Sequence, residues 1–160
     1  MTTEKARLVR SEGYKDALEF ALSIGLQNDY KNDPQAKKDV IDLSGDAYSV
    51  KSGSKRWQIF LYRRSRFETD DAFQSMNGIG QLLIECIDTF PDNYEDYYRE
   101  KRFYKEKLRS LMKKLLEKFQ EKRRVRTFLG KAIFNGGEVN YLAVKHNNIF
   151  HVFAYRDVID

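Results

Sequence analysis

The sequence has few residues that cross-link a chain or interrupt regular structure. It contains one cysteine, Cys86, two prolines and nine glycines in 160 residues. A single cysteine excludes an intrachain disulfide and a cysteine-based zinc cluster, so we expect a cytoplasmic protein. No segment approaches the ~20 continuous apolar residues that span a bilayer. Residues 1–7 lack the apolar run of a secretory signal, so we expect no membrane partner.

Large apolar side chains are plentiful. Hydrophobic residues make up 41% and aromatic residues 14% of the chain, too many for a disordered segment. The length is close to the commonest domain size, so residues 1–160 are expected to form a single domain. Residues 156–160 read as the opening of another element, a pattern that also suits a fragment of a longer protein.

Positive charge is concentrated in one segment. The net charge is +5, but residues 1–98 carry 13 basic against 17 acidic side chains. Residues 99–126 carry 13 basic against 4 acidic side chains, a net charge of +9. Such asymmetry predicts a polyanionic partner, and nucleic acid is the commonest one inside a cell.

The first half of the chain predicts a helix followed by a sheet. Apolar residues at helical spacing indicate a helix over 11–25, and the polar residues 27–38 indicate a surface loop. Three strands are predicted at 39–43, 47–51 and 57–62, joined by tight turns into an antiparallel meander. The third is apolar on both faces, which favours a central position in the sheet.

The second half predicts helices and then a hairpin. A helix is expected from Thr69 to Phe90, and one long basic helix, or two, over 94–126. Residues 128–155 contain turn signals between alternating runs and predict two or three strands. The expected fold class is mixed α/β (α+β), with a long basic helix and a C-terminal β-hairpin region.

Polar residues on the first two predicted strands form the strongest candidate site. Asp39 begins one strand, and Ser49-Val50-Lys51 lies on its antiparallel neighbour. A carboxylate and an ammonium would then meet at one edge of the sheet, where a divalent metal and a phosphate could bind. With the turn centred on Gly45, Asp39 pairs across from Lys51, whereas a shift of one residue would substitute Asp42.

Residues 11–88, in the order helix, strand, strand, strand, helix, resemble the core of the PD-(D/E)XK nucleases, the superfamily of the type II restriction endonucleases. The resemblance rests on Asp39, Ser49-Val50-Lys51 and Trp57-Gln58-Ile59. It implies a restriction-type, Mg²⁺-dependent DNA endonuclease in which Asp39 holds Mg²⁺ and Lys51 orients or activates the attacking water. The sequence departs from the family pattern at Ser49, which replaces an acid, and at Lys38, which replaces a proline.

The same resemblance implies that a displaced acid replaces the one missing at position 49. Glu68, before the second predicted helix, is the preferred candidate, with Glu85 and Glu19 as alternatives. Gln58 is expected beside the site on the face of Lys51. The expected catalytic residues are Asp39, Ser49, Lys51, Glu68 and Gln58, and the expected metal ligands are Asp39 and Glu68.

Arginine clusters are the expected contacts to double-stranded DNA, and they comprise Arg63, Arg64, Arg66, Arg123, Arg124 and Arg126. The rival hypothesis is a non-catalytic nucleic-acid-binding or regulatory domain with a decayed nuclease-like site, and Ser49 favours it. The leucine-rich stripe of 94–126 also suits pairing with a second copy, so we expect a homodimer. His146 and His151 flank a predicted turn and are interpreted as structural or surface residues.

Overall fold

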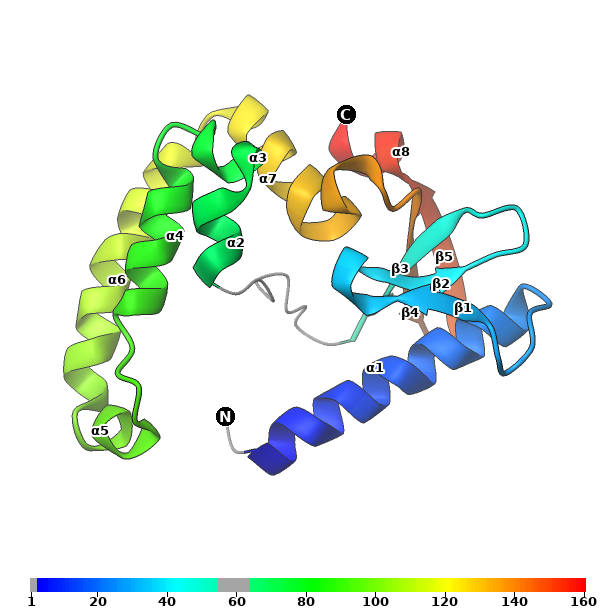
Figure 1. Cartoon of the computed structure of the whole chain (residues 1–160), viewed down its shortest axis with the longest axis horizontal. Helices are drawn as coiled ribbons and strands as arrows, with labels where there is room; N and C mark the ends of the chain where they lie inside the picture. Colours follow the sequence, from blue (N-terminus) through cyan, green and yellow to red (C-terminus); the bar gives the residue numbers. More distant parts are fainter. Residues whose placement is uncertain (1–2, 55–63) are drawn as a thin grey trace. The chain divides into compact units, whose positions relative to one another are not determined.

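The structure, a computed structural model, describes residues 3–54 and 64–160 (Figure 1). It divides into two compact units. The sheet unit comprises Met1–Ile59 and Leu129–Asp160, and the helical unit comprises Phe60–Phe128. In the part of the chain so described, no helix is long and apolar enough to cross a membrane.

A five-stranded mixed sheet forms the centre of the sheet unit. Its strands are β1 (Lys31–Asp33), β2 (Lys38–Ile41), β3 (Ala47–Ser52), β4 (Tyr141–His146) and β5 (Ile149–Ala154), in the spatial order β1-β2-β3-β4-β5. Neighbouring strands are antiparallel except β3 and β4, which are parallel. A parallel pair needs a long crossover connection, and here the whole helical unit is inserted into it.

Helices cover both faces of this sheet. On one face lies α1 (Thr3–Ser23), which contributes Ala17, Phe20 and Ala21 to a core shared with Val40, Val50 and Ala143 (Figure 1). On the other face, the end of α7 (Lys122–Phe134) and α8 (Tyr155–Ile159) form a core of Ile133, Phe134, Val139, Leu142 and Ile159. Successive strand residues point to opposite faces, so β4 supplies Ala143 to the first core and Leu142 to the second.

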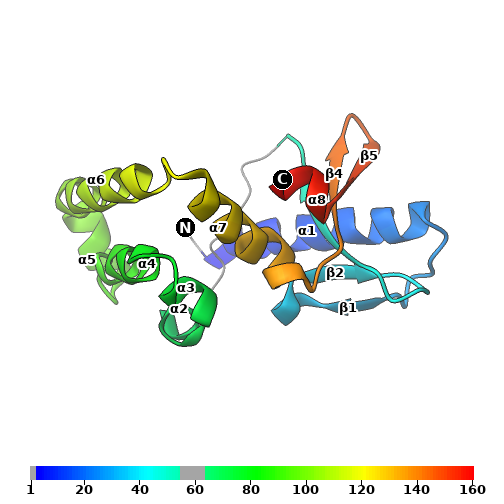
Figure 2. The same cartoon turned by 90° about the horizontal axis from the view of Figure 1, so that it is seen from above.

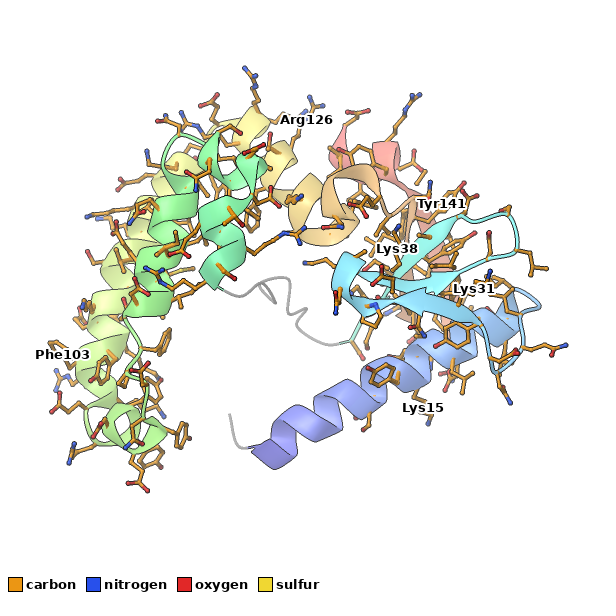
Figure 3. The ribbon with its side chains drawn as sticks, in the orientation of Figure 1. Lys15, Lys31, Lys38, Phe103, Arg126 and Tyr141 are labelled. Atoms are coloured by element: carbon orange, nitrogen blue, oxygen red, sulfur yellow. The ribbon has the colours of Figure 1, made fainter. Side chains whose placement is uncertain are left out.

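Short segments support the ends of these elements. The 3-10 helix η1 (Pro34–Ala36) precedes β2, and η2 (Asn135–Gly137) follows α7. Lys37 donates from Nζ to the carbonyl of Ala132, and Lys38 Nζ lies 3.6 Å from the carboxylate of Glu138 (Figure 3). The start of β2 is therefore tied to the end of α7.

The helical unit packs around its own core. Its helices are α2 (Arg64–Thr69), α3 (Asp71–Gln74), α4 (Ile79–Asp88), α5 (Tyr94–Arg99), α6 (Lys101–Lys118) and the first part of α7. Its buried apolar residues include Phe67, Phe73, Met76, Ile79, Leu82, Leu83, Ile84, Leu115 and Phe128. Helix α4 packs against α6, so the leucine-rich stripe of the basic segment contacts α4 within the same chain.

The mixed α/β class, the N-terminal helix, the strands around Asp39 and Lys51 and the C-terminal hairpin are confirmed. The predicted loop 27–38 is wrong in part, because it contains β1, a polar edge strand without apolar alternation. Residues 128–134 are helical rather than extended. The predicted strand 57–62 lies outside the described residues.

The predicted helix from Thr69 to Phe90 is also wrong as a single element. Asp70, rather than Thr69, caps α3 by accepting the N–H of Ala72 at 3.1 Å. Asn77 and Gly78 then adopt positive φ angles of 49° and 82°, which no α-helix accommodates. The long basic segment is also divided, into α5, α6 and the first part of α7.

Gly80 allows α4 to approach α3 closely. A Cβ at this position would lie 2.7 Å from the carbonyl oxygen of Phe73, whereas a Cβ at Gly13 in α1 would meet nothing within 4 Å. We expect Gly80→Ala to destabilise the protein by about 1–3 kcal/mol, because backbone must move. Gly13→Ala, the control, should stabilise α1 by about 0.5–1 kcal/mol. Urea unfolding measures both, and equal effects would contradict this packing.

Candidate active site

The carboxylate of Asp39 brings three residues of β3 together. Its Oδ2 atom accepts the backbone N–H of Val50 at 2.7 Å and lies 3.4 Å from both the Ser49 hydroxyl and the Lys51 ammonium. We call Asp39, Ser49 and Lys51 the Asp39 cluster. The structure therefore assembles three of the five expected catalytic residues on one strand pair.

The strand register explains why these side chains meet. Val40 pairs with Tyr48 and Ile41 with Ala47, so Asp39 continues the ladder toward Ser49. The predicted pairing of Asp39 with Lys51 is thus wrong by two residues. Side chains alternate with a period of two, so this even shift leaves Asp39 on the same face as Lys51.

The Asp39 cluster is partly accessible to solvent. The Lys51 and Asp39 side chains are 25% and 31% exposed, whereas Ser49 is 1% exposed. A substrate could therefore reach the ammonium and the carboxylate but not the hydroxyl. Burial raises the pKa of the nearby Tyr30 phenol, and the negative charge of Asp39 adds to that increase.

Asp42, the alternative to Asp39, organises the turn between β2 and β3. Its carboxylate accepts the Ser44 N–H at 2.9 Å, the Asp46 N–H at 3.0 Å and the Tyr48 hydroxyl at 2.9 Å. Burial opposes the charged form of Asp42, but these hydrogen bonds together lower its pKa. Burial and the Asp42 contact raise the pKa of Tyr48 to about 12. Asp42 thus has a structural role in the turn.

Glu19 belongs to a second charged cluster. Lys145 on β4 donates to Glu19 and, at 3.1 Å, to Asp16, and both acids lie on α1. The hydrogen bond to Glu19 raises the pKa of Lys145, and that from Lys145 lowers the pKa of Glu19. Lys145 was not among the residues predicted from the sequence, where its only signal is a lysine following the apolar run 141–144.

The other proposed acids lie in the helical unit. Arg64 pairs with Glu68 and also binds the two carboxylate oxygens of Asp88 at 2.9 and 3.1 Å. That contact lowers the pKa of Asp88. Glu85 lies on α4. Gln58 and Arg63 lie outside the described residues.

Mg²⁺ prefers oxygen ligands and is usually held by one or two carboxylates together with substrate phosphates. In residues 3–54 and 64–160, no group of three histidine, cysteine, aspartate or glutamate side chains could hold a metal ion. The Asp39 cluster contributes a single carboxylate. It therefore meets only the lower limit of what Mg²⁺ requires.

The expected DNA contacts differ in their surroundings. Arg66 lies 3.0 Å from Asp70, and Arg124 lies 2.7 Å from Glu121. Arg123 is exposed, whereas Arg126, labelled in Figure 3, is half-buried with a buried Nε atom. One face of α6 carries four further exposed cations at helical spacing, Arg102, Lys105, Arg109 and Lys113. These four residues were not predicted individually from the sequence.

Comparison of the chain with family models, with curated proteins and with solved structures finds no match. A function for this chain therefore has to be inferred from the geometry of the Asp39 cluster and from the distribution of charge.

The ion pairs of Lys145 with Asp16 and Glu19 predict a pH-dependent contribution to the stability of the fold. Lys145→Met leaves Asp16 and Glu19 without their cation, so we expect a melting temperature several degrees lower near neutral pH. Because the folded pKa of Glu19 lies below its ordinary 4.5, the difference should shrink as the pH falls through that lowered value and Glu19 protonates. Calorimetry from pH 7 to pH 3 checks this, with Lys31→Met on the edge strand as the control.

Proposed function

We propose that the chain is a Mg²⁺-dependent phosphodiesterase that cleaves double-stranded DNA, with Asp39 and Lys51 as its catalytic residues and Ser49 as a positioning residue. One observation carries the proposal: a carboxylate and a lysine from two strands meet, 3.4 Å apart, in a position that substrate can reach. An adjacent carboxylate and ammonium are the groups that bind a divalent cation and a phosphate, and here they lie on the interior strands β2 and β3.

The order of elements supports the same proposal. Helix α1 is followed by the antiparallel strands β1, β2 and β3, and the helices α2 to α7 then precede β4, which is parallel to β3. The resemblance to PD-(D/E)XK nucleases implies a helix, three strands and a helix in that order. β2 and β3 correspond to the first two of the predicted strands, and the third, 57–62, lies outside the described residues.

Each residue of the Asp39 cluster has a distinct role in this proposal. Asp39 is the ligand for Mg²⁺, and Ser49 and the Val50 N–H fix the orientation of its carboxylate. Lys51 binds a phosphate oxygen and positions the attacking water beside the phosphorus. The ion, when bound, supplies Lewis-acid stabilisation of the charge that develops on the phosphate.

The basic helices supply the affinity for the polyanion. The segment 99–126 carries a net charge of +9, and many of its cations are exposed on α6 and α7. Phosphate contacts hold a duplex in place without reading its sequence. Helices α6 and α7 are therefore the proposed surface for the DNA backbone.

A second candidate is a DNA-binding domain without catalytic activity. It is favoured by the single carboxylate of the Asp39 cluster and by Ser49, which is 1% exposed where an acid would be needed. Glu68, the expected second carboxylate, is paired with Arg64 in the helical unit. Under this hypothesis the Asp39–Lys51 ion pair only stabilises the β2–β3 pair.

Plasmid cleavage distinguishes the two candidates. We expect the wild-type protein to cut DNA with Mg²⁺ but not with EDTA, and Asp39→Asn and Lys51→Met each to reduce the rate at least ~100-fold. Asn retains an oxygen that can accept the Val50 N–H, so the fold should persist. Lys38→Met, the neighbouring lysine on β2, is the control. DNA binding without cleavage by the wild type would favour the second candidate.

Salt dependence tests the proposed DNA surface. Replacing Arg123, Arg124 and Arg126 by Gln should weaken binding equally for every DNA sequence. The slope of log affinity against log salt should fall by about one unit for each arginine that binds a phosphate in the wild type. A control with Lys15, Lys31 and Arg156 replaced by Gln removes the same charge from the sheet unit. Equal effects of the two triple variants would mean that only net charge matters.

A further inference from the structure

The two edges of the sheet differ in how they are protected. β1 has three residues, of which Lys31 and Asp33 are charged, and Pro34 follows directly (Figure 3). Its pairing with β2 is also irregular between Lys31 and Asp33. A short strand, charges, a bulge and a proline are the features that prevent an edge from pairing with another chain.

β5 forms the other edge and has none of these features. Its six residues, Ile149–Ala154, contain no Asp, Glu, Lys, Arg or Pro, and they pair with β4 in continuous register (Figure 2). Ile149, Val152 and Phe153 are 61%, 47% and 41% exposed. An uncharged, regular edge strand with exposed apolar side chains can add a further strand.

The hairpin geometry defines which backbone groups of β5 point outward. Asn147 and Asn148 form a two-residue turn with φ angles of 49° and 60°, so His146 and Ile149 are a hydrogen-bonded pair. Hydrogen-bonded and non-hydrogen-bonded pairs alternate along an antiparallel ladder. The Tyr155 N–H, 3.0 Å from the Asn140 oxygen, agrees with this alternation. The outward groups therefore belong to Phe150, Val152 and Ala154.

One of the three outward N–H groups is used within the chain. The carboxylate of Asp157 in α8 accepts the Ala154 N–H at 3.1 Å. Phe150 and Val152 thus retain outward N–H and C=O groups for an added strand. An added antiparallel strand that hydrogen-bonds to both Phe150 and Val152 therefore has its central residue opposite His151.

We propose that a second copy of this chain docks antiparallel on β5, with the two-fold axis at His151. Phe150 of each copy then pairs with Val152 of the other, and Ile149 pairs with Phe153. All four cross-strand pairs are apolar, and each would stabilise the dimer modestly. The edge is therefore complementary to itself, and it offers no charge that would select a basic or an acidic peptide.

This interface replaces the one expected from the sequence. The leucine-rich stripe of 94–126 was expected to pair with a second copy, but Leu115 is 2% exposed and α6 packs on α4. The β5 edge is independent of the proposed nuclease activity. If that activity holds, the dimer carries two Asp39 clusters related by a two-fold axis, an arrangement suited to cutting both strands of a duplex.

Charge substitutions at His151 test the register. His151→Asp or His151→Lys places two like charges opposite each other, so we expect each variant to sediment as a monomer and the wild type as a dimer. A mixture of the two variants should recover the dimer, because opposite charges then meet. His146→Asp on β4 is the control and should remain dimeric. A monomeric wild type, or a dimeric His151→Asp variant, would overturn the proposal.

Cross-linking provides a second readout if the charged variants fold poorly. Opposed residues of a non-hydrogen-bonded pair have Cα atoms about 4.5 Å apart, within the range of a disulfide. In a Cys86→Ala background, His151→Cys should form an intermolecular disulfide under mild oxidation, and His146→Cys should not. Equal cross-linking of the two variants would show that the two-fold axis does not pass through His151.

Discussion

The carboxylate of Asp39 accepts the Val50 N–H at 2.7 Å beyond the last paired residues of β2 and β3, Val40 and Tyr48. A buried backbone N–H needs a hydrogen-bond acceptor, and for Val50 the side chain of Asp39 takes the place of a backbone carbonyl of β2. The bond fixes the Asp39 oxygen that also contacts Ser49 and Lys51. The candidate chemistry therefore depends on an interaction that also stabilises the sheet.

The sheet separates two charged clusters that the sequence alone does not distinguish. Asp39 and Lys51 form one pair, and Lys145 with Asp16 and Glu19 forms the other, on the face covered by α1. The second cluster occupies Glu19, an acid considered for a metal site. The two edge strands of the sheet also differ from each other, because β1 is charged and irregularly paired whereas β5 is apolar and regularly paired.

The hairpin of β2 and β3 and its Asp39–Lys51 cluster could be predicted, because an even error in register keeps residues on the same face. The register itself depends on the turn, in which Asp42 binds Ser44 and Asp46. β1 could not be predicted, since an exposed polar strand lacks alternation. The break before α4 has a sequence signal, the turn-forming dipeptide Asn77-Gly78. Apolar residues at helical spacing on both sides of this dipeptide led instead to the prediction of one continuous helix. The ion pairs of Lys145 depend on tertiary packing.

The central claim is that the Asp39 carboxylate binds Mg²⁺ at a nuclease site. The amide resonance of Val50 reports on it directly, because this N–H bonds the same carboxylate. In a Mg²⁺ titration with a non-cleavable DNA duplex, we expect a saturable shift of this resonance in the wild type and none in Asp39→Asn. A Val50 resonance that stays unchanged while Mg²⁺ supports cleavage of ordinary DNA would contradict the account.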